Sequence, residues 1–217
     1  AMTGKTGTGK YELLLERCRE LDPIPTAVAH PCEETALVGA LDAADLGLIR
    51  PILVGPVAKI REVAARAQRD ISGFEIVDAP HSHAAATEAV QVVTSGRAEL
   101  LMKGSLHSDE LLSAVVARDS GLRTERRVSH VFLMDVPTYH KVLIVTDAAI
   151  NIAPDLDAKA DICRNAIDLA IAMDVPQPKV AVLAAVETVN SKMIATIDAA
   201  ALCKMADRNQ IVGGLID

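Results

Sequence analysis

The stretch Leu100–Leu112 reads Leu-Leu-Met-Lys-Gly-Ser-Leu-His-Ser-Asp-Glu-Leu-Leu, and it contains one β-α unit in miniature. An apolar run ends in Lys103-Gly104-Ser105, and an amphipathic pattern typical of a helix follows. The first amides of a helix lack intrahelical partners and the helix dipole makes them partly positive, so this turn predicts a phosphate site. Gly104 would let the backbone come close to an anion, Ser105 would offer a hydroxyl and an amide, and Lys103 would bring a full charge.

The same residues also fit an ordinary strand-to-helix turn in which Ser105 or Ser108 is the N-cap of the helix. Local sequence does not decide between the two interpretations. The rest of the chain has to supply the context.

Short β-branched runs alternate with longer segments of helical period almost from end to end of the chain. This alternation is typical of an α/β fold whose sheet is largely parallel. Apolar residues at steps of three and four predict helices over Tyr11–Leu21, Glu33–Leu46, Pro56–Arg69, Ser82–Thr94 and Ser108–Arg118. The strands predicted between them are Thr26–Ala29, Pro51–Val54, Phe74–Val77 and Glu99–Met102.

The pattern changes beyond Gly121. The next two predicted strands, Ser129–Asp135 and Lys141–Thr146, are too close together to enclose a crossover helix, so we expect an antiparallel pair and a change of lobe. The predicted domains are therefore residues 1–128 and 129–217. Helices and strands alternate again in the remainder, over Asp157–Met173, Lys179–Leu183, Asn190–Asp207 and Ile211–Ile216. Because a β-α series that ends on a strand lacks that strand's helix, we expect the protein to continue past Asp217.

Composition narrows the class of function. Half of the residues are apolar, yet there is no Trp and only two Phe and two Tyr, so Ala, Val, Leu and Ile must build the core, as they do where helices pack on a parallel sheet. A net charge of −7 and the scarcity of aromatic rings argue against nucleic acid as a partner. No signal segment opens the chain and no apolar run is long enough to cross a bilayer, so we expect a cytoplasmic protein with no membrane partner.

The four cysteines lie far apart without a C-x-x-C pair, and we expect all of them to be reduced. Near the start of the chain, Gly4–Lys10 matches the opening of a P-loop, G-x-x-x-x-G-K. A P-loop needs a preceding strand and a Ser or Thr after the lysine, whereas Tyr11 follows here. A flexible polar leader is the preferred interpretation.

Arg118–Arg127 places four arginines in ten residues of an acidic protein. Guanidinium groups bind phosphate oxygens bidentately, so this loop predicts contact with a phosphate or a phosphorylated cofactor, with Arg123 beside Gly121 as the first choice. The alternative is a solvated surface.

Thr146–Asp155 follows a predicted strand whose carboxyl end should face a ligand cleft. Polar residues gather at such strand ends in α/β folds, so Asp147 and Asn151 are candidate site residues. Asp155 is instead expected to cap the next helix.

The histidines at 81, 83, 107, 130 and 140 show no metal-ligand spacing with cysteines or carboxylates, so no metal site is predicted. His81-Ser82-His83 is expected to open a helix at the surface. His130 begins a strand directly after the arginine loop and stays a candidate, although a structural role is favoured. The chain contains neither a Gly-x-Ser-x-Gly elbow nor a dinucleotide glycine fingerprint.

Several segments, in order along the chain, resemble the phosphate acetyltransferase/phosphate butyryltransferase family, with the butyryltransferase-like branch as the closer match. They are Leu101–Ser105, Ser129–Asp135, Thr146–Leu156, Lys159–Ala166, Pro178–Asn190 and Gln210–Asp217. The resemblance runs from about Pro25 to the last residue, and its second half is the more specific because several motifs occur there in the family's order.

This resemblance implies a transferase that moves an acyl group reversibly between coenzyme A and inorganic phosphate, giving an acyl phosphate. No cofactor would be bound permanently, and coenzyme A would be a substrate. The implied fold is a three-layer α/β/α architecture similar to the isocitrate and isopropylmalate dehydrogenases. It has two lobes with a cleft between them, and it is commonly a homodimer.

The resemblance also assigns roles to the candidate site residues. Those that match the phosphate side are Lys103, Gly104 and Ser105. Those on the cleft wall are Thr146, Asp147 and Asn151. Arg123, in the basic loop, would face coenzyme A or phosphate.

One departure from the family concerns catalysis. Family chains continue past the Gly-Gly-Leu-Ile-Asp strand into a Gly-Pro-Leu segment and a Ser-Arg motif with a nearby acid, which serve catalysis and complete the first lobe. The catalytic residues are therefore expected past Asp217, and these 217 residues alone are expected to be a poor catalyst.

Two other functions stay open. The chain could be an acyl-carrier-protein:phosphate acyltransferase, or a regulatory domain that binds acyl-CoA without catalysis. The acyl chain preferred cannot be predicted, because one methylene in an apolar pocket is worth only about 1–3 kcal/mol.

Overall fold

The computed structural model describes residues 9–217 and divides into two compact units. Of the described residues, the N-terminal unit comprises 12–124, and the C-terminal unit comprises 125–217 together with 9–11. The P-loop-like motif Gly4–Lys10 lies, up to residue 8, outside the described residues.

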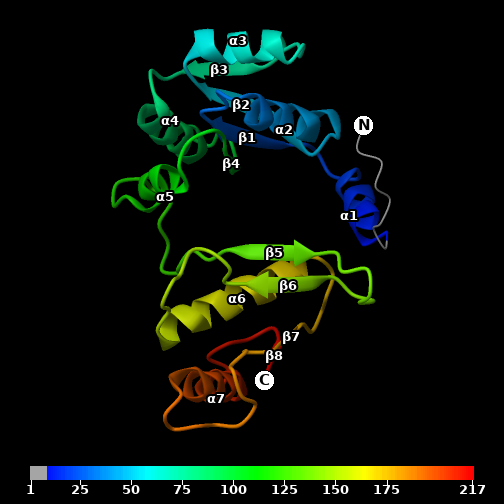
Figure 1. Ribbon diagram of the computed structural model, residues 1–217, viewed down its shortest axis with the longest axis vertical. Coiled ribbons are helices and arrows are strands. Elements are labelled where there is room, and N and C mark those ends of the chain that lie inside the picture. Colours follow the sequence, from blue (N-terminus) through cyan, green and yellow to red (C-terminus); the bar gives the residue numbers. More distant parts are fainter. Residues whose placement is uncertain (1–8) are drawn as a thin grey trace. The chain divides into compact units, whose positions relative to one another are not determined.

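The N-terminal unit is built on one sheet of parallel strands in the order β3-β2-β1-β4 (Figure 1). The strands are β1 (Ile24–Ala29), β2 (Ile49–Gly55), β3 (Glu75–Asp78) and β4 (Leu100–Lys103). The helices that begin in this half of the chain are α1 (Lys10–Cys18), α2 (Glu34–Asp45), α3 (Val57–Arg66), α4 (Ser82–Thr94) and α5 (Ser108–Val116). Each predicted element is found here within a few residues of its expected bounds.

Two apolar cores cover the two faces of this sheet. On one face Val28 and Leu53 pack with apolar residues of α2 and α3, such as Leu37 and Ile60. On the other face the neighbouring strand positions pack with the alanine-rich α4 and with Leu111 of α5. Side chains alternate between faces along a strand, so a continuous apolar run buries both faces of a parallel sheet. The N-terminal unit therefore confirms the predicted three-layer α/β/α arrangement with a parallel sheet.

The order of the strands reverses at β1. From β1 the chain moves outward to β2 and then β3, and after α4 it returns to the opposite side of β1 as β4. In open parallel sheets, ligands bind outside the carboxyl ends of the strands at such a reversal. The residues that follow β1 and β4 consequently occupy the favoured position for a ligand site in this unit.

The C-terminal unit holds two small sheets and two helices (Figure 1). β5 (Val131–Met134) pairs antiparallel with β6 (Leu143–Thr146), and β7 (Lys179–Val180) pairs parallel with β8 (Leu215–Ile216). The helices are α6 (Leu156–Ala172) and α7 (Ile194–Asp207). Their core joins Ala160, Cys163 and Ile167 of α6 to Leu202 of α7 and to Ile211. The predicted antiparallel pair is confirmed.

Three predicted bounds in this unit are wrong. The strand predicted over Ile211–Ile216 is reduced to β8, because Ile211 is buried among the helices and Gly213 has a φ of +91°, which breaks an extended run. The strand predicted over Lys179–Leu183 pairs only as β7. The helix predicted from Asn190 begins at Ile194, because the Asn190 side chain accepts from Lys192 N and Thr196 Oγ1 bonds the Asn190 backbone, a local turn that competes with the helix.

None of the helices in the described part of the chain is both long and apolar enough to cross a membrane. All four cysteines are free, as predicted.

Candidate functional site

The turn after β4 is tied to the end of β1 by its backbone. Gly104 N donates to Ala29 O at 2.8 Å, and Ser105 N donates to His30 O at 2.9 Å. Both amides that the sequence offered to an anion are therefore already used within the protein. What remains available at this turn is the side chain of Lys103, which is exposed and whose Nζ lies 3.3 Å from Gly104 O.

Gly104 is needed here for contact between backbones. A Cβ at this position would lie 2.3 Å from Ala29 O and 2.6 Å from His30 O. Such distances are far inside van der Waals contact, so any side chain would force the ends of β1 and β4 apart. The close approach predicted from the glycine exists, and its partner is β1.

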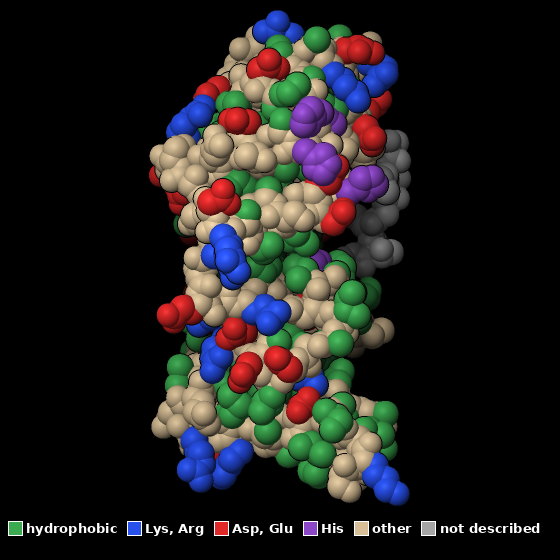
Figure 2. All heavy atoms as spheres, turned by 90° about the vertical axis from the view of Figure 1, so that its left-hand side faces the viewer, with side chains coloured by type: hydrophobic (Ala, Val, Ile, Leu, Met, Phe, Trp, Pro, Cys, Tyr) green, Lys and Arg blue, Asp and Glu red, His purple; other side chains and the backbone are tan. Residues whose placement is uncertain are grey.

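The N-cap of α5 is His107, so the interpretation that placed Ser105 or Ser108 there is wrong. His107 N donates to Glu110 Oε2 at 3.3 Å, while Glu110 Oε1 lies 3.2 Å from both the Ser82 hydroxyl and His83 Nε2. Figure 2 shows histidine side chains gathered on one face of the molecule. His81 is the exposed N-cap of α4, as expected for His81-Ser82-His83, and its Nδ1 accepts from Ala84 N.

His30 is a neighbour of the candidate turn that sequence reasoning missed. It follows β1 directly, and its Nδ1 lies 3.4 Å from Ser105 Oγ. The Ser105 hydroxyl also donates to His30 O at 2.8 Å and accepts from Cys32 N at 3.0 Å. Only the order of the strands places His30 beside Ser105, and no local motif marks it.

The arginine loop divides into paired and unpaired side chains. Arg126 forms an ion pair with Asp168 of α6, and Arg127 N donates to Asp161 at 2.9 Å. Arg123 is exposed and forms no hydrogen bond or ion pair with residues 9–217. The Arg123 side chain is therefore free to meet a ligand.

In the C-terminal unit, three predicted residues come together at the end of β6. Thr146 Oγ1 donates to His130 O at 2.8 Å, and Asn151 Nδ2 donates to Val128 O at 2.9 Å and to Asp147 Oδ2. Asp147 accepts backbone hydrogen bonds from His130, Ala149, Ile150 and Asn151 at 3.0–3.2 Å. The group fastens the loop after β6 to the segment before β5.

These contacts fix the charge of Asp147. Burial raises its pKa, but hydrogen bonds from Ala149 N–H, from the Asn151 side chain and from the Ile150 and Asn151 amides outweigh that effect and lower the pKa to about 2. The carboxylate is thus ionised at neutral pH and saturated with donors. It can hold a loop in place, and it is a poor proton acceptor.

Asp155 and His130 lie next to this group in the C-terminal unit. Asp155 is the N-cap of α6 and accepts from Ala158 N at 2.8 Å, as predicted. His130 packs edge-on against Phe132, with ring centroids 4.4 Å apart, and its buried Nδ1 has no hydrogen-bond partner among the residues described.

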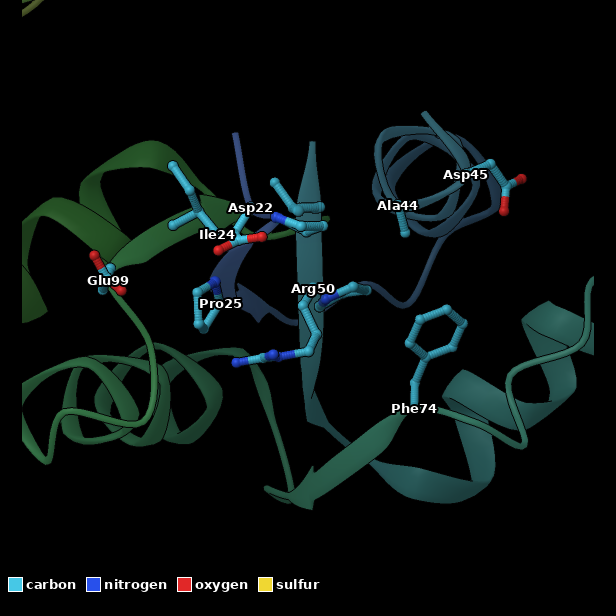
Figure 3. Close-up of a pocket in the computed structure, with 11 residues that line it drawn as sticks. Asp22, Ile24, Pro25, Ala44, Asp45, Arg50, Phe74 and Glu99 are labelled. Atoms are coloured by element: carbon cyan, nitrogen blue, oxygen red, sulfur yellow. The ribbon is translucent and has the colours of Figure 1, made fainter. Parts of the chain in front are cut away.

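A hollow of about 670 Å³ lies around the amino ends of the strands of the N-terminal sheet, at the end opposite to Lys103 and His30 (Figure 3). Figure 3 shows Arg50 in its middle, between Phe74 and Glu99. Asp22, Asp45 and Glu99 line it together with Arg50, so its charges oppose one another. It contains none of the predicted site residues. Ligands of open parallel sheets bind at the carboxyl ends of the strands, whereas this hollow lies at their amino ends. Within residues 9–217, no group of three or more His, Cys, Asp or Glu side chains could hold a metal ion.

A family model and several relatives of known name point to the same protein family. A family model described as phosphate acetyl/butaryl transferase matches residues 80–217. A phosphate acetyltransferase of Rhizobium meliloti is 59% identical over 96% of this chain and 66% of its own length. A phosphate butyryltransferase of Clostridium acetobutylicum is 38% identical over 93% of this chain and 66% of its own length. The chain thus spans about two thirds of the length of these two relatives. It spans a smaller share, 58%, of the phosphate acetyltransferase of Rickettsia prowazekii.

Solved structures agree on the fold. A phosphotransacetylase from Streptococcus pyogenes superposes with a TM-score of 0.76 at 17% identity, covering 96% of this chain and 73% of that one. A branched-chain phosphotransacylase from Enterococcus faecalis gives a TM-score of 0.69 at 24% identity, over 89% of this chain and 67% of that one.

Proposed function

Because the chain belongs to the phosphate acetyl/butaryl transferase family, we propose that its protein transfers an acyl group between coenzyme A and inorganic phosphate. The observation that carries this proposal is the family match over residues 80–217, together with 59% identity to a phosphate acetyltransferase. A phosphate oxygen bonds to the acyl carbon as the carbon–sulfur bond breaks. Coenzyme A leaves as the thiol, and the acyl phosphate is the second product.

The positive side chains of the N-terminal unit hold the phosphate in this proposal. Lys103 is exposed at the carboxyl end of β4, beside the strand reversal, and no acid pairs with its ammonium group among the described residues. Arg123 is similarly unpaired and binds phosphate oxygens or the phosphates of coenzyme A. Since the Gly104 and Ser105 amides and the hydrogen of the Ser105 hydroxyl are used within the fold, attraction of phosphate depends on side-chain charge.

In this proposal the Thr146–Asn151 loop has a positioning role. Asp147 is ionised and fully hydrogen-bonded, so it positions Asn151 and the loop amides and does not exchange protons with the substrate. The group that protonates the departing thiolate is then a different one. We propose that this group belongs to the part of the relatives' length that the chain does not span.

The remaining parts of the proposal rest on the same family. Coenzyme A is a substrate and no cofactor is bound permanently. The protein works as a homodimer in the cytoplasm. Exposed apolar side chains on the β5–β6 sheet, including Phe132, Met134 and Val145, support an interface on the C-terminal unit.

The test is phosphate-dependent thiol release from a series of acyl-CoA thioesters of increasing chain length, measured with a thiol reagent. It is run on the 217-residue chain and on a longer chain containing the segments that the relatives have in addition. We expect release that requires phosphate, with the acyl phosphate trapped as its hydroxamate by hydroxylamine. Binding of acyl-CoA by the longer chain without release of thiol would contradict the proposal and favour a regulatory acyl-CoA-binding domain.

A further inference from the structure

His30 lies at the point where the order of the strands reverses. It directly follows β1, and Lys103 and Ser105 stand at and after the end of β4, the strand paired with β1 on the side away from β2. His30 has a φ of +55°, a backbone conformation uncommon for a residue with a side chain. Residues held in such conformations are frequent at ligand sites.

The Ser105 hydroxyl decides which nitrogen of His30 carries the proton. A hydroxyl has one hydrogen and two lone pairs. The Ser105 hydrogen goes to His30 O at 2.8 Å, and one lone pair accepts from Cys32 N at 3.0 Å. At 3.4 Å from Nδ1, Ser105 Oγ can then only accept, so Nδ1 must donate. The imidazole is therefore the Nδ1–H tautomer, and Nε2 keeps its lone pair.

Nε2 is free to bind a ligand. Apart from these contacts with Ser105, through its hydroxyl and its backbone, the His30 ring forms no hydrogen bond or ion pair with the part of the chain that the structure describes. Burial lowers the pKa of His30, and the positive charge of Lys59 from α3 lowers it further. A backbone hydrogen bond with Ser105 and the charges of Glu110 from α5 and Glu33 before α2 act in the opposite direction, and burial prevails. At neutral pH the ring is uncharged.

We infer that His30 is a substrate-binding residue, whose Nε2 accepts a hydrogen bond from a protonated oxygen of inorganic phosphate held at the ends of β1 and β4. The inference rests on the proposed phosphate-dependent function and adds a source of selectivity to it. Near neutral pH every phosphate ion carries at least one O–H group, whereas sulfate carries none. An acceptor on the protein therefore favours phosphate and repels the oxygen lone pairs of sulfate, which a lysine alone would bind equally well.

The tautomer is tested by long-range proton–nitrogen correlation spectra of the ¹⁵N-labelled 217-residue chain near neutral pH, a measurement that needs no turnover. The His30 signals are identified by their absence in His30→Gln. We expect a protonated Nδ1 and an unprotonated Nε2 in the parent and in Ser105→Thr, and loss of that preference in Ser105→Ala. An Nε2–H tautomer in the parent would overturn the inference.

The ligand is tested in the same spectra by adding phosphate or sulfate at matched ionic strength. Phosphate should shift the Nε2 signal and sulfate should not. Equal shifts with both anions, or none with phosphate, would refute the role of His30. His140→Gln, which alters an exposed histidine of the C-terminal unit, is the matched control and should leave the His30 response unchanged.

Kinetics separates this inference from the proposed function. In the chain that transfers acyl groups, His30→Gln should raise the KM for phosphate about fivefold or more and leave the KM for acyl-CoA within about twofold. The ratio of the inhibition constant for sulfate to the KM for phosphate should fall, because the variant no longer favours phosphate over sulfate. Acyl transfer with unaltered phosphate-to-sulfate selectivity in His30→Gln would refute the inference alone. Absence of acyl transfer in the parent would refute the proposed function, while the spectra would still decide whether His30 binds phosphate.

Discussion

Replacing Gly104 with alanine should destabilise the N-terminal unit more than any change in local helix or strand preference could. The added Cβ would lie 2.3 Å from Ala29 O and 2.6 Å from His30 O. Both are backbone atoms at the end of a central, buried strand, and neither can rotate away as the tip of a flexible side chain would. The ends of β1 and β4 would have to separate.

The cost follows from the contacts that this separation disturbs. Forcing an extra methyl group into a filled space costs about 1–3 kcal/mol. The separation also stretches the hydrogen bonds from Gly104 N and Ser105 N, which are 2.8 and 2.9 Å long, and each contributes about 1 kcal/mol. We expect a loss of about 3–5 kcal/mol in the free energy of unfolding, a large share of what a domain of this size possesses.

Cys32 offers a probe confined to the unit in question. It is 2% exposed and packs in the core between the sheet and α2, so its alkylation in urea reports opening of the N-terminal unit. The urea midpoint for labelling of Cys32, read by mass spectrometry of its peptide, should fall sharply in Gly104→Ala. Gly39→Ala is the matched control: its Cβ would meet nothing within 4 Å inside α2, and alanine should stabilise the helix by about 0.5–1 kcal/mol. A midpoint for Gly104→Ala equal to that of the parent, or equal to that of Gly39→Ala, would refute the close approach.

Three further substitutions test the site. Lys103→Ala should raise the KM for phosphate or lower turnover about tenfold or more in the acyl-transfer assay, and unchanged kinetics would remove Lys103 from the site. Arg123→Ala should raise the KM for phosphate or for coenzyme A about tenfold. Arg126→Ala, which removes the ion pair with Asp168, should leave both KM values unchanged, and equal effects of the two substitutions would argue against a separate role for Arg123. Asp147→Asn should reduce stability at neutral pH by about 1–2 kcal/mol, allowing for solvent screening. The pKa of Asp147 in the folded protein, about 2, lies below its ordinary value of 3.8, so the carboxylate stabilises the fold above pH 3.8 and this stabilisation is lost as the pH falls towards 2. Urea midpoints measured by circular dichroism should therefore decline less steeply between these pH values in Asp147→Asn than in the parent. Parallel declines would contradict the assignment.

Elements with local signals at both ends were predictable from the sequence. The helix predicted over Ser82–Thr94 is found with those bounds, since His81 caps its first turn and Gly96, with a φ of +78°, follows its end. The antiparallel pairing of β5 with β6 was equally accessible, because a short connection excludes a crossover. Sequence reasoning failed where the partner was distant: Ile211 belongs to an apolar run that looks like a strand, yet it is buried against α6 and α7.

The same limit explains the outcome at Lys103-Gly104-Ser105. The same residues suit two kinds of turn: one whose amides bind an anion, and one whose amides extend the pairing with a neighbouring strand. Both need a glycine for close approach, a small hydroxyl residue and an apolar strand before them. Only the register of β4 against β1, in which Lys103 lies opposite Ala29, shows that both amides are consumed. That register also brings Ser105 to His30, across a separation that no local pattern encodes. Phosphate recognition at this strand end should therefore depend on the side chains of Lys103 and His30. Hydrogen bonds from the Gly104 and Ser105 amides to individual phosphate oxygens should not contribute to it.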